Sequence, residues 1–201
     1  MIGIPLGLAV SNAAEWLLHK HVLHGQGRSP TSFWNFHLDE HHVSALRNHG
    51  HDAAYEGSPF RWNAQGRELI GLAMLAVPVA ALFPVAPFFA GTLVYGGVRY
   101  YRCHKRAHLD PAWARAHLPW HYDHHMGPDQ EANWCVTHPW FDNVMGTRRP
   151  YVGTEAEARD EARRALLDAT RRSSPTAPSP LPTARAVPRA AETLDGCAES
   201  V

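Results

Sequence analysis

The 201-residue chain is poor in cysteine, has no excess of either charge and contains no familiar nucleotide or hydrolase motif. Its three cysteines, Cys103, Cys135 and Cys197, form no C-x-x-C pair, which excludes a disulfide scaffold and a cysteine zinc finger. Lys plus Arg and Asp plus Glu both number 19, so the net charge is zero and a basic nucleic-acid binder is excluded. No glycine-rich phosphate loop, G-x-S-x-G motif or internal repeat is present.

Histidine, by contrast, is abundant, at 15 of 201 residues. Most of the histidines fall into four groups, which read HKHVLH at residues 19–24, HLDEHH at 37–42, HKRAH at 104–108 and HLPWHYDHH at 117–125. Residues four apart share a face of an α-helix. The spacing therefore predicts that His37 lies beside His41 and that His104 lies beside His108. It also predicts that His117 lies beside His121, His124 or His125.

The number of clustered histidines points to metal ions. Imidazole is a good ligand for zinc, iron, copper and nickel, and one catalytic or structural zinc ion needs only three or four protein ligands. Ten imidazoles from at least four segments are too many for one ion, which predicts two ions with about four or five ligands each. An all-nitrogen dimetal site can bind O2 and tolerates the high oxidation states that C–H cleavage needs. His49 and His51 are expected to be ordinary surface residues.

Apolar residues are concentrated at positions 2–18 and 69–101. The first stretch reaches roughly 25 Å as a helix, which favours a membrane segment, with a buried helix as the alternative. The second has Pro84 and Pro87 in its middle, which predicts two antiparallel helical legs of about 15 residues in a short transmembrane hairpin. Basic residues lie on both flanks of the hairpin and none at its turn, which favours a cytoplasmic location for both flanks.

The end of the chain differs from the rest. Residues 155–172 interleave acidic and basic side chains, which predicts a solvated surface helix within a segment spanning 151–172. Residues 173–201 are rich in Pro, Ser and Ala, which predicts a disordered tail. We therefore expect the histidines and both apolar stretches to form one domain over residues 1–150.

Residues 14–147 resemble the fatty acid hydroxylase/sterol desaturase superfamily of integral-membrane histidine-box enzymes. The resemblance rests on EWLLHKHVLH (15–24), HLDEHH (37–42), HKRAH (104–108), HYDHH (121–125) and the closing NWCVTHPWFDNVMGT (133–147), in that order around the apolar hairpin. The first two boxes also look similar to those of carotenoid hydroxylases. The resemblance implies an all-α, integral-membrane fold with a cytoplasmic helical cap that holds the dimetal site.

By the same resemblance the protein would activate O2 at two metal ions, usually iron, and hydroxylate an unactivated C–H bond of a lipid-like substrate. No haem domain is present, so a separate electron donor of the ferredoxin or cytochrome type would be needed. The implied ligands are His19, His24, His37, His41, His42, His104, His108, His121, His124 and His125. Residues expected to orient these ligands or to line the substrate entrance are Glu15, Asp39, His117, Asp123, Asn133 and Asp142.

Several alternatives stay open. A desaturase or a carotenoid hydroxylase would use the same scaffold, and imidazole accepts zinc as well as iron. A membrane metal-binding or transport protein would bind ions without catalysis, although transporters usually place ionisable groups near the bilayer midplane. A metal-dependent hydrolase would mix carboxylate and histidine ligands. The second box also departs from the family, with three residues rather than two between His37 and His41.

Overall fold

The computed structural model describes residues 2–173, where the regular elements are all helices and no strand is present, in agreement with the predicted all-α class. The α-helices are α1 (Gly3–Leu18), α2 (Val43–Arg47), α3 (Ala64–Ala80), α4 (Pro87–Leu109), α5 (Pro111–His117), α6 (Pro119–Met126), α7 (Trp140–Met145) and α8 (Glu155–Ser173). Two π-helices, η1 (His19–Gly25) and η4 (His37–His42), and three 3-10 turns, Gln26–Arg28, Phe33–Asn35 and Ala53–Tyr55, complete the described chain.

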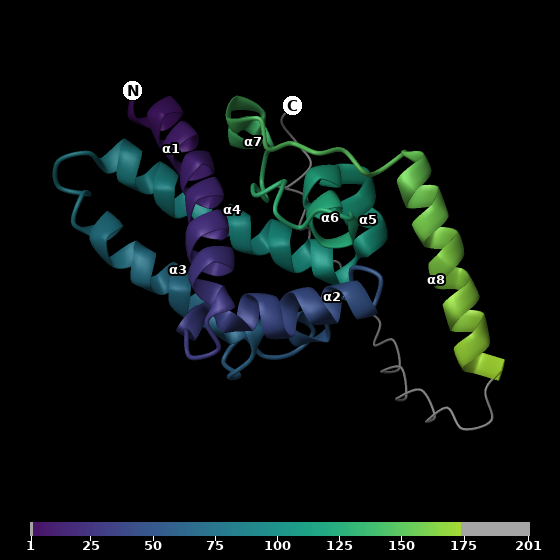
Figure 1. Cartoon of the computed structure of the whole chain (residues 1–201). Coiled ribbons are helices and arrows are strands. Elements are labelled where there is room, and N and C mark those ends of the chain that lie inside the picture. The colour runs from purple at the N-terminus through teal and green to yellow at the C-terminus, as the bar shows by residue number, and fades with distance from the viewer. Residues whose placement is uncertain (1, 174–201) are drawn as a thin grey trace, which may run out of the picture.

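Helices α1 and α4 cross in close contact, as Figure 1 shows. Small residues allow the close approach. A Cβ atom added at Gly7 of α1 would lie 2.7 Å from the Cβ of Thr92 in α4, and one added at Gly96 would collide with the Ser11 hydroxyl. The contact holds the C-terminal end of α1, where the segment with His19 and His24 begins, close to α4, which carries His104 and His108.

Helices α3 and α4 form the hairpin that the sequence predicts (Figure 1). Pro87 occupies the first turn of α4, where a missing N–H costs nothing, and Pro84 lies in the connecting turn. Pro78 lies inside α3, near its end. The prolines therefore mark this turn, as predicted, because proline disrupts the interior of a helix but is tolerated in its first turn.

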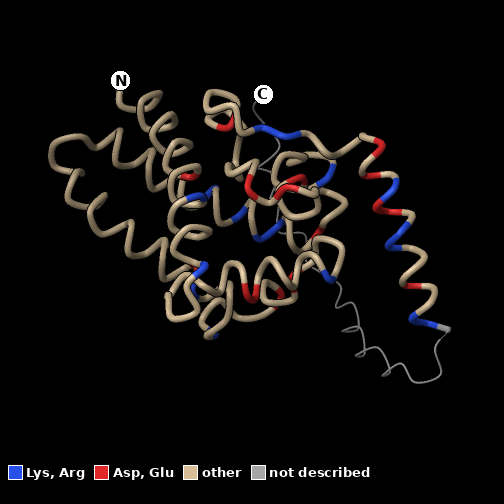
Figure 2. The backbone as a smooth tube through the Cα atoms, viewed as in Figure 1, with Lys and Arg blue, Asp and Glu red and all other residues tan. Residues whose placement is uncertain are grey.

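The prediction that this hairpin and residues 2–18 cross a membrane is wrong. No helix within residues 2–173 is both long enough and apolar enough to span one. Helix α3 has 17 residues, about 26 Å, and the longer α4 carries basic side chains in its second half (Figure 2). The predicted integral-membrane fold, and the predicted membrane location with the metal site on its cytoplasmic face, are corrected accordingly.

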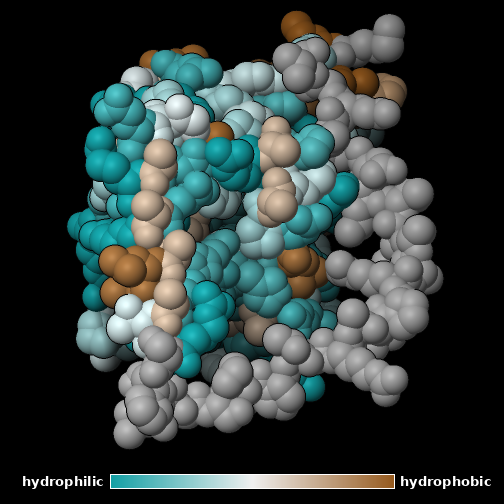
Figure 3. All heavy atoms as spheres, turned by 90° about the vertical axis from the view of Figure 1, so that its right-hand side faces the viewer, coloured by the Kyte–Doolittle hydropathy of each residue, from teal (hydrophilic) through white to brown (hydrophobic). Residues whose placement is uncertain are grey.

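Apolar side chains are nevertheless exposed along α1 and the hairpin, among them Leu6 (53%), Met74 (60%) and Phe88 (62%). The face on the α8 side is different, since Figure 3 shows it to be mainly hydrophilic, with isolated hydrophobic residues. The exposed apolar surface is therefore unevenly distributed over the molecule.

Helix α8 covers the predicted surface helix and extends to Ser173. Arg115 donates two hydrogen bonds to the carboxylate of Glu157, at 2.7 and 2.9 Å, and Arg164 donates to the carbonyl of Met126. These contacts hold α8 against α5 and α6 (Figure 1). The predicted tail from residue 174 onward lies outside the described residues.

The centre of the molecule is made largely of histidine. Among the described residues, buried aliphatic and aromatic side chains form two small clusters, one around Cys103 and Leu118 and one around Trp16 and Trp134. Most of the large side chains that are fully buried are imidazoles, namely His24, His37, His41, His104, His108, His121, His124 and His125. A core of this kind is uncommon, because buried polar groups need partners.

Candidate metal centre

Four segments bring the ten implied ligands into the core. They are η1 with His19 and His24, η4 with His37, His41 and His42, α4 with His104 and His108, and α6 with His121, His124 and His125. None of these residues is more than 4% exposed. Segments that are distant in the sequence therefore meet at one buried place.

Nine of the ten form two groups whose potential ligand atoms lie within 4.8 Å of one another, and either group could hold a metal ion. The five-histidine group is His19, His24, His37, His42 and His124. The four-histidine group is His41, His104, His108 and His125. His121 belongs to neither group, but its Nε2 lies 3.1 Å from Nε2 of His108. The structure therefore contains two adjoining candidate sites, which is the number that the sequence predicts.

The π-helices decide which histidines share a group. Their i→i+5 hydrogen bonds widen the turn, so that residues five apart lie on one face. His19 joins His24 in this way, and His37 joins His42. His37 and His41 do lie side by side as predicted, with ring centroids 5.3 Å apart, but they belong to different groups. His104 and His108, which lie on a true α-helix, are grouped as predicted.

Backbone carbonyls orient three of the imidazoles. The Nδ1 atoms lie 2.6 Å from the carbonyl oxygen of Trp134 for His19, 2.7 Å from that of Ala132 for His124, and 2.8 Å from that of Gly50 for His108. A carbonyl only accepts hydrogen bonds, so each Nδ1 carries the proton and each Nε2 presents a lone pair. This is the tautomer that a metal ligand requires.

Carboxylates orient three more imidazoles, through residues that the sequence did not single out. Nδ1 of His41 donates to Asp52 at 2.8 Å, and Nδ1 of His104 donates to Glu68 at 2.7 Å. Glu131 accepts more weakly, at 3.2 Å from His24. Glu68 also accepts the hydroxyl proton of Tyr55. A signal existed for Glu68, the last charge before the long apolar stretch, but Asp52 has none beyond its neighbours His49 and His51.

Burial favours the neutral form of nine of the ten imidazoles. It lowers the pKa well below the usual value, and neighbouring imidazoles lower it further, for His19, His37, His42, His108, His121, His124 and His125. Burial likewise lowers the pKa of His24 and His41, although their carboxylate partners oppose the shift. Lone pairs are therefore available at neutral pH.

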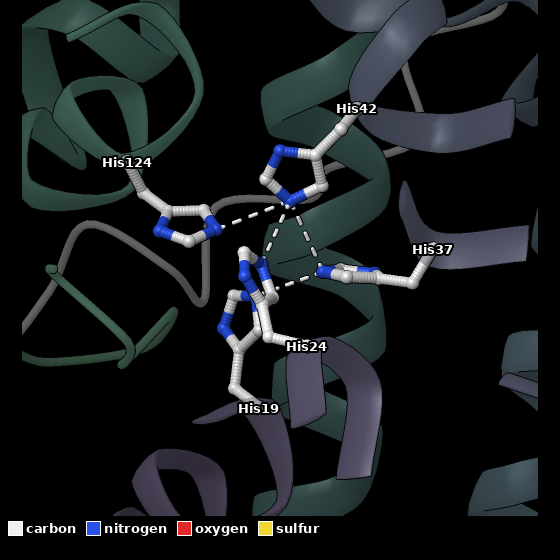
Figure 4. Close-up of side chains that lie close together, drawn as sticks. All are labelled: His19, His24, His37, His42 and His124. Carbon is white, nitrogen blue, oxygen red and sulfur yellow. Dashed lines mark hydrogen bonds between the residues drawn. The ribbon is translucent and has the colours of Figure 1, made fainter. Parts of the chain in front are cut away.

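In the five-histidine group the Nε2 atoms crowd together (Figure 4). The separations are 2.9 Å for His19–His37 and 3.2 Å for His24–His42, His37–His42 and His42–His124. His19, His24 and His124 commit their protons at Nδ1, so only His37 and His42 can donate from Nε2. Two N–H groups make at most two hydrogen bonds, so at least two of these four close contacts have no hydrogen bond and are unfavourable.

A cation bound between the nitrogens makes these close contacts favourable. With metal–nitrogen bonds of about 2.1 Å, two ligands at a right angle have their nitrogens about 3 Å apart, which is close to the observed spacing. In the four-histidine group, Nε2 of His41, His104 and His125 has no hydrogen-bond partner within residues 2–173. Orphaned buried nitrogens and close nitrogen–nitrogen contacts without a hydrogen bond both fit a transition-metal ion.

The other predicted site residues do not contact the ten imidazoles through the hydrogen bonds of the described chain. Glu15 accepts from the backbone N–H groups of Val136 and Thr137 and from the Thr137 hydroxyl, and burial raises its pKa to about 7 against these bonds. Asp142 accepts from the N–H groups of Trp134 and Cys135. Both therefore hold the segment whose Trp134 carbonyl orients His19.

The remaining candidates lie farther from the groups. Asp123 accepts from the N–H of Val152 and pairs with Arg148 at 2.7 Å. Asn133, which has a positive φ of 59°, holds residues 148 and 149, while Asp39 is exposed. His117 stacks on Trp113 and hydrogen-bonds its carbonyl.

The two histidines that were expected to be surface residues, His49 and His51, lie outside both histidine groups. His49 is half exposed and pairs with Asp168, and His51 pairs with Glu56. Outside both groups, His138 accepts a hydrogen bond from Arg99 and stacks on Trp140.

No protein-family model, curated protein or solved structure matches this chain. The chemistry of the two histidine groups is therefore the main indication of function.

Proposed function

We propose that the protein is a dimetal oxygenase related to the fatty acid hydroxylase/sterol desaturase superfamily. The observation that carries the proposal is the convergence of neutral imidazole lone pairs in two adjoining buried groups. The order of the histidine boxes adds the family resemblance. Hydrolases of the zinc class use fewer imidazoles and usually a carboxylate ligand, which makes them a poorer match.

The five-histidine and four-histidine groups would each hold one ion, and His121 could complete the second. Two iron ions held there would supply O2 activation for attack on a C–H bond. The protein's own contribution is to fix each Nε2 through its Nδ1 partner and to keep water out of the histidine core. These Nδ1 partners come from distant segments of the chain and fix the positions of the ligand atoms before any ion enters.

A lipid-like, apolar substrate is consistent with the exposed apolar residues of α1 and the α3–α4 hairpin. The proposed reaction also needs electrons, which a separate ferredoxin- or cytochrome-type donor would supply. Hydroxylation and desaturation share this scaffold and differ only in the product.

The test is to express the full chain with iron and candidate lipids under 18O2 and to follow the lipids by mass spectrometry. His124→Ala removes a ligand from the five-histidine group. His49→Asn is the matched control, since His49 is exposed and Asn tolerates its positive φ of 55°. A lipid that gains one 18O with the wild type and the control, but not with His124→Ala, supports hydroxylation.

Loss of two hydrogens in the same pattern would indicate desaturation instead. Protein that contains fewer than two metal ions per chain after iron supplementation would contradict the dimetal proposal.

A further inference from the structure

The two histidine groups differ in the charge that surrounds them. In the four-histidine group, His41 and His104 donate to the carboxylates of Asp52 and Glu68. In the five-histidine group, His19 and His124 donate to neutral carbonyls, and His24 donates to Glu131. The imidazoles of the four-histidine group therefore include two that donate to buried carboxylates, whereas those of the five-histidine group donate mainly to neutral carbonyls.

The two carboxylates of the four-histidine group are buried and have no basic counterion. Asp52 is 3% and Glu68 8% exposed, and within residues 2–173 neither forms an ion pair with Lys or Arg. Ser44 and the N–H of Ala54 donate to Asp52, and Tyr55 donates to Glu68. These neutral donors hold each carboxylate in place without cancelling its charge.

Glu131, in contrast, is 53% exposed at its side chain and pairs with Arg28 at 2.7 Å. Its charge is thus screened by solvent and offset by a guanidinium. A divalent ion in the five-histidine group would keep most of its charge in a buried place, which is costly. An ion in the four-histidine group would face two buried negative charges that compensate it.

Carboxylate partners also strengthen the ligands themselves. A carboxylate behind a histidine raises the basicity of the imidazole and fixes its tautomer, and loss of such a partner typically costs about 10–100-fold in metal affinity.

We propose that the four-histidine group is the high-affinity site, which fills first, and that Asp52 and Glu68 are the positioning residues that set this order. The five-histidine group fills second and exchanges its ion more readily. This inference rests on the proposed dimetal function, since it requires that both groups bind an ion.

Stepwise titration of the metal-free full chain with Co2+, followed by absorption and calorimetry, tests the order. We expect two binding steps whose dissociation constants differ by at least about tenfold, in line with the effect of carboxylate partners. His104→Ala should remove the tighter step and His37→Ala the weaker one. Two steps of equal affinity, or loss of the tighter step in His37→Ala, would overturn the inference. Absence of any Co2+ binding would instead contradict the proposed function itself.

Asp52→Asn is the sharpest variant. Its Oδ1 still accepts from Ser44 and Ala54, while the new amide donates to Nδ1 of His41. His41 must then carry its proton on Nε2, so a ligand is lost without a change of shape. We expect the tighter step to weaken about 10–100-fold. Glu131→Gln is the matched control and should leave this step unchanged.

Circular dichroism of each variant separates loss of binding from loss of folding. If Asp52→Asn does not fold, Glu68→Gln provides the same comparison at His104. A folded Asp52→Asn or Glu68→Gln variant with an unchanged tighter step would show that the carboxylates do not set the order.

Discussion

His124 and His125 are neighbours in the sequence, yet they belong to different histidine groups. Their rings lie 5.1 Å apart and are inclined at 84°. His41 and His42 divide in the same way, with ring planes at 87°. Successive residues on a helix point in different directions, so α6 and η4 each serve both groups at once. These two helices form the wall that the candidate sites share.

Replacement of one histidine in this wall should therefore affect one site and not both. We expect His124→Ala to lower the metal content from about two ions per chain to about one, because the four-histidine group keeps all its members. Elemental analysis of the purified, reconstituted protein provides the measurement. Loss of both ions from a folded variant would mean that the groups do not bind independently.

Chelation should destabilise the protein. Ions that bind only the folded state add about 4 kcal/mol to its stability when their concentration is 1,000 times the dissociation constant. Removal of the ions also leaves the close nitrogen–nitrogen contacts among His19, His37 and His42 without a cation between them. We expect the melting temperature to fall when EDTA is added and to recover with iron or zinc. An unchanged melting temperature would count against binding in the core.

The α1–α4 crossing offers a matched pair of glycines. Gly7→Ala should cost about 1–3 kcal/mol, because its new methyl group would lie 2.7 Å from Thr92 Cβ. Gly91→Ala lies in the same α4 helix with nothing within 4 Å of the added Cβ, and should instead stabilise by up to about 1 kcal/mol. Urea denaturation measures both. Equal effects of the two substitutions would contradict the close packing.

Asp142 should stabilise the protein, because it binds the backbone of residues 134 and 135, and the carbonyl of Trp134 orients His19. Asp142→Ala leaves the buried N–H groups of Trp134 and Cys135 without acceptors, at about 1–3 kcal/mol for each. We expect a clear fall in the urea midpoint, while Asp39→Ala, at an exposed position, should leave it unchanged.

Glu15 should make stability depend on pH in an unusual direction. Its pKa is raised from 4.5 to about 7, so between these values the folded state binds a proton that the unfolded state has released. The stabilisation is therefore complete below pH 4.5 and is lost as the pH rises towards 7, on the order of 3 kcal/mol in all.

Glu15→Gln isolates this effect. Gln keeps an oxygen for the N–H groups of Val136 and Thr137, and its amide can donate to the Thr137 hydroxyl. The buried histidines titrate in both proteins, so their influence cancels in the difference. We expect the wild type to lose stability relative to the variant between pH 5 and 8 in urea titrations. A constant difference would place the pKa of Glu15 near its ordinary value.

The same residues show how far sequence reasoning reached. The four histidine clusters contain all ten imidazoles that the core encloses, and the resemblance to the histidine-box family separated these ten from His21 and His117. The prolines located the hairpin turn. The membrane prediction was wrong because it rested on apolar content alone. Whether a segment can span a membrane depends on the length of its helix and on the charges that the helix carries, and α4 includes several basic residues.

Partners and pairings were beyond the sequence. Asp52 and Glu68 reach their histidines across 11 and 36 positions, and no local pattern marks such contacts. The grouping of His37 with His42 depends on a π-helix, whose i→i+5 bonds are selected by packing rather than by local propensity.

The sequence by itself determined the chemistry of this protein, which is a helical chain whose histidines outnumber the needs of a single metal ion. Only the tertiary structure decided how they divide into two groups and which carboxylates stand behind them. The physical reason is that ligand type depends on residue identity, whereas ligand geometry and local charge depend on which distant segments pack together.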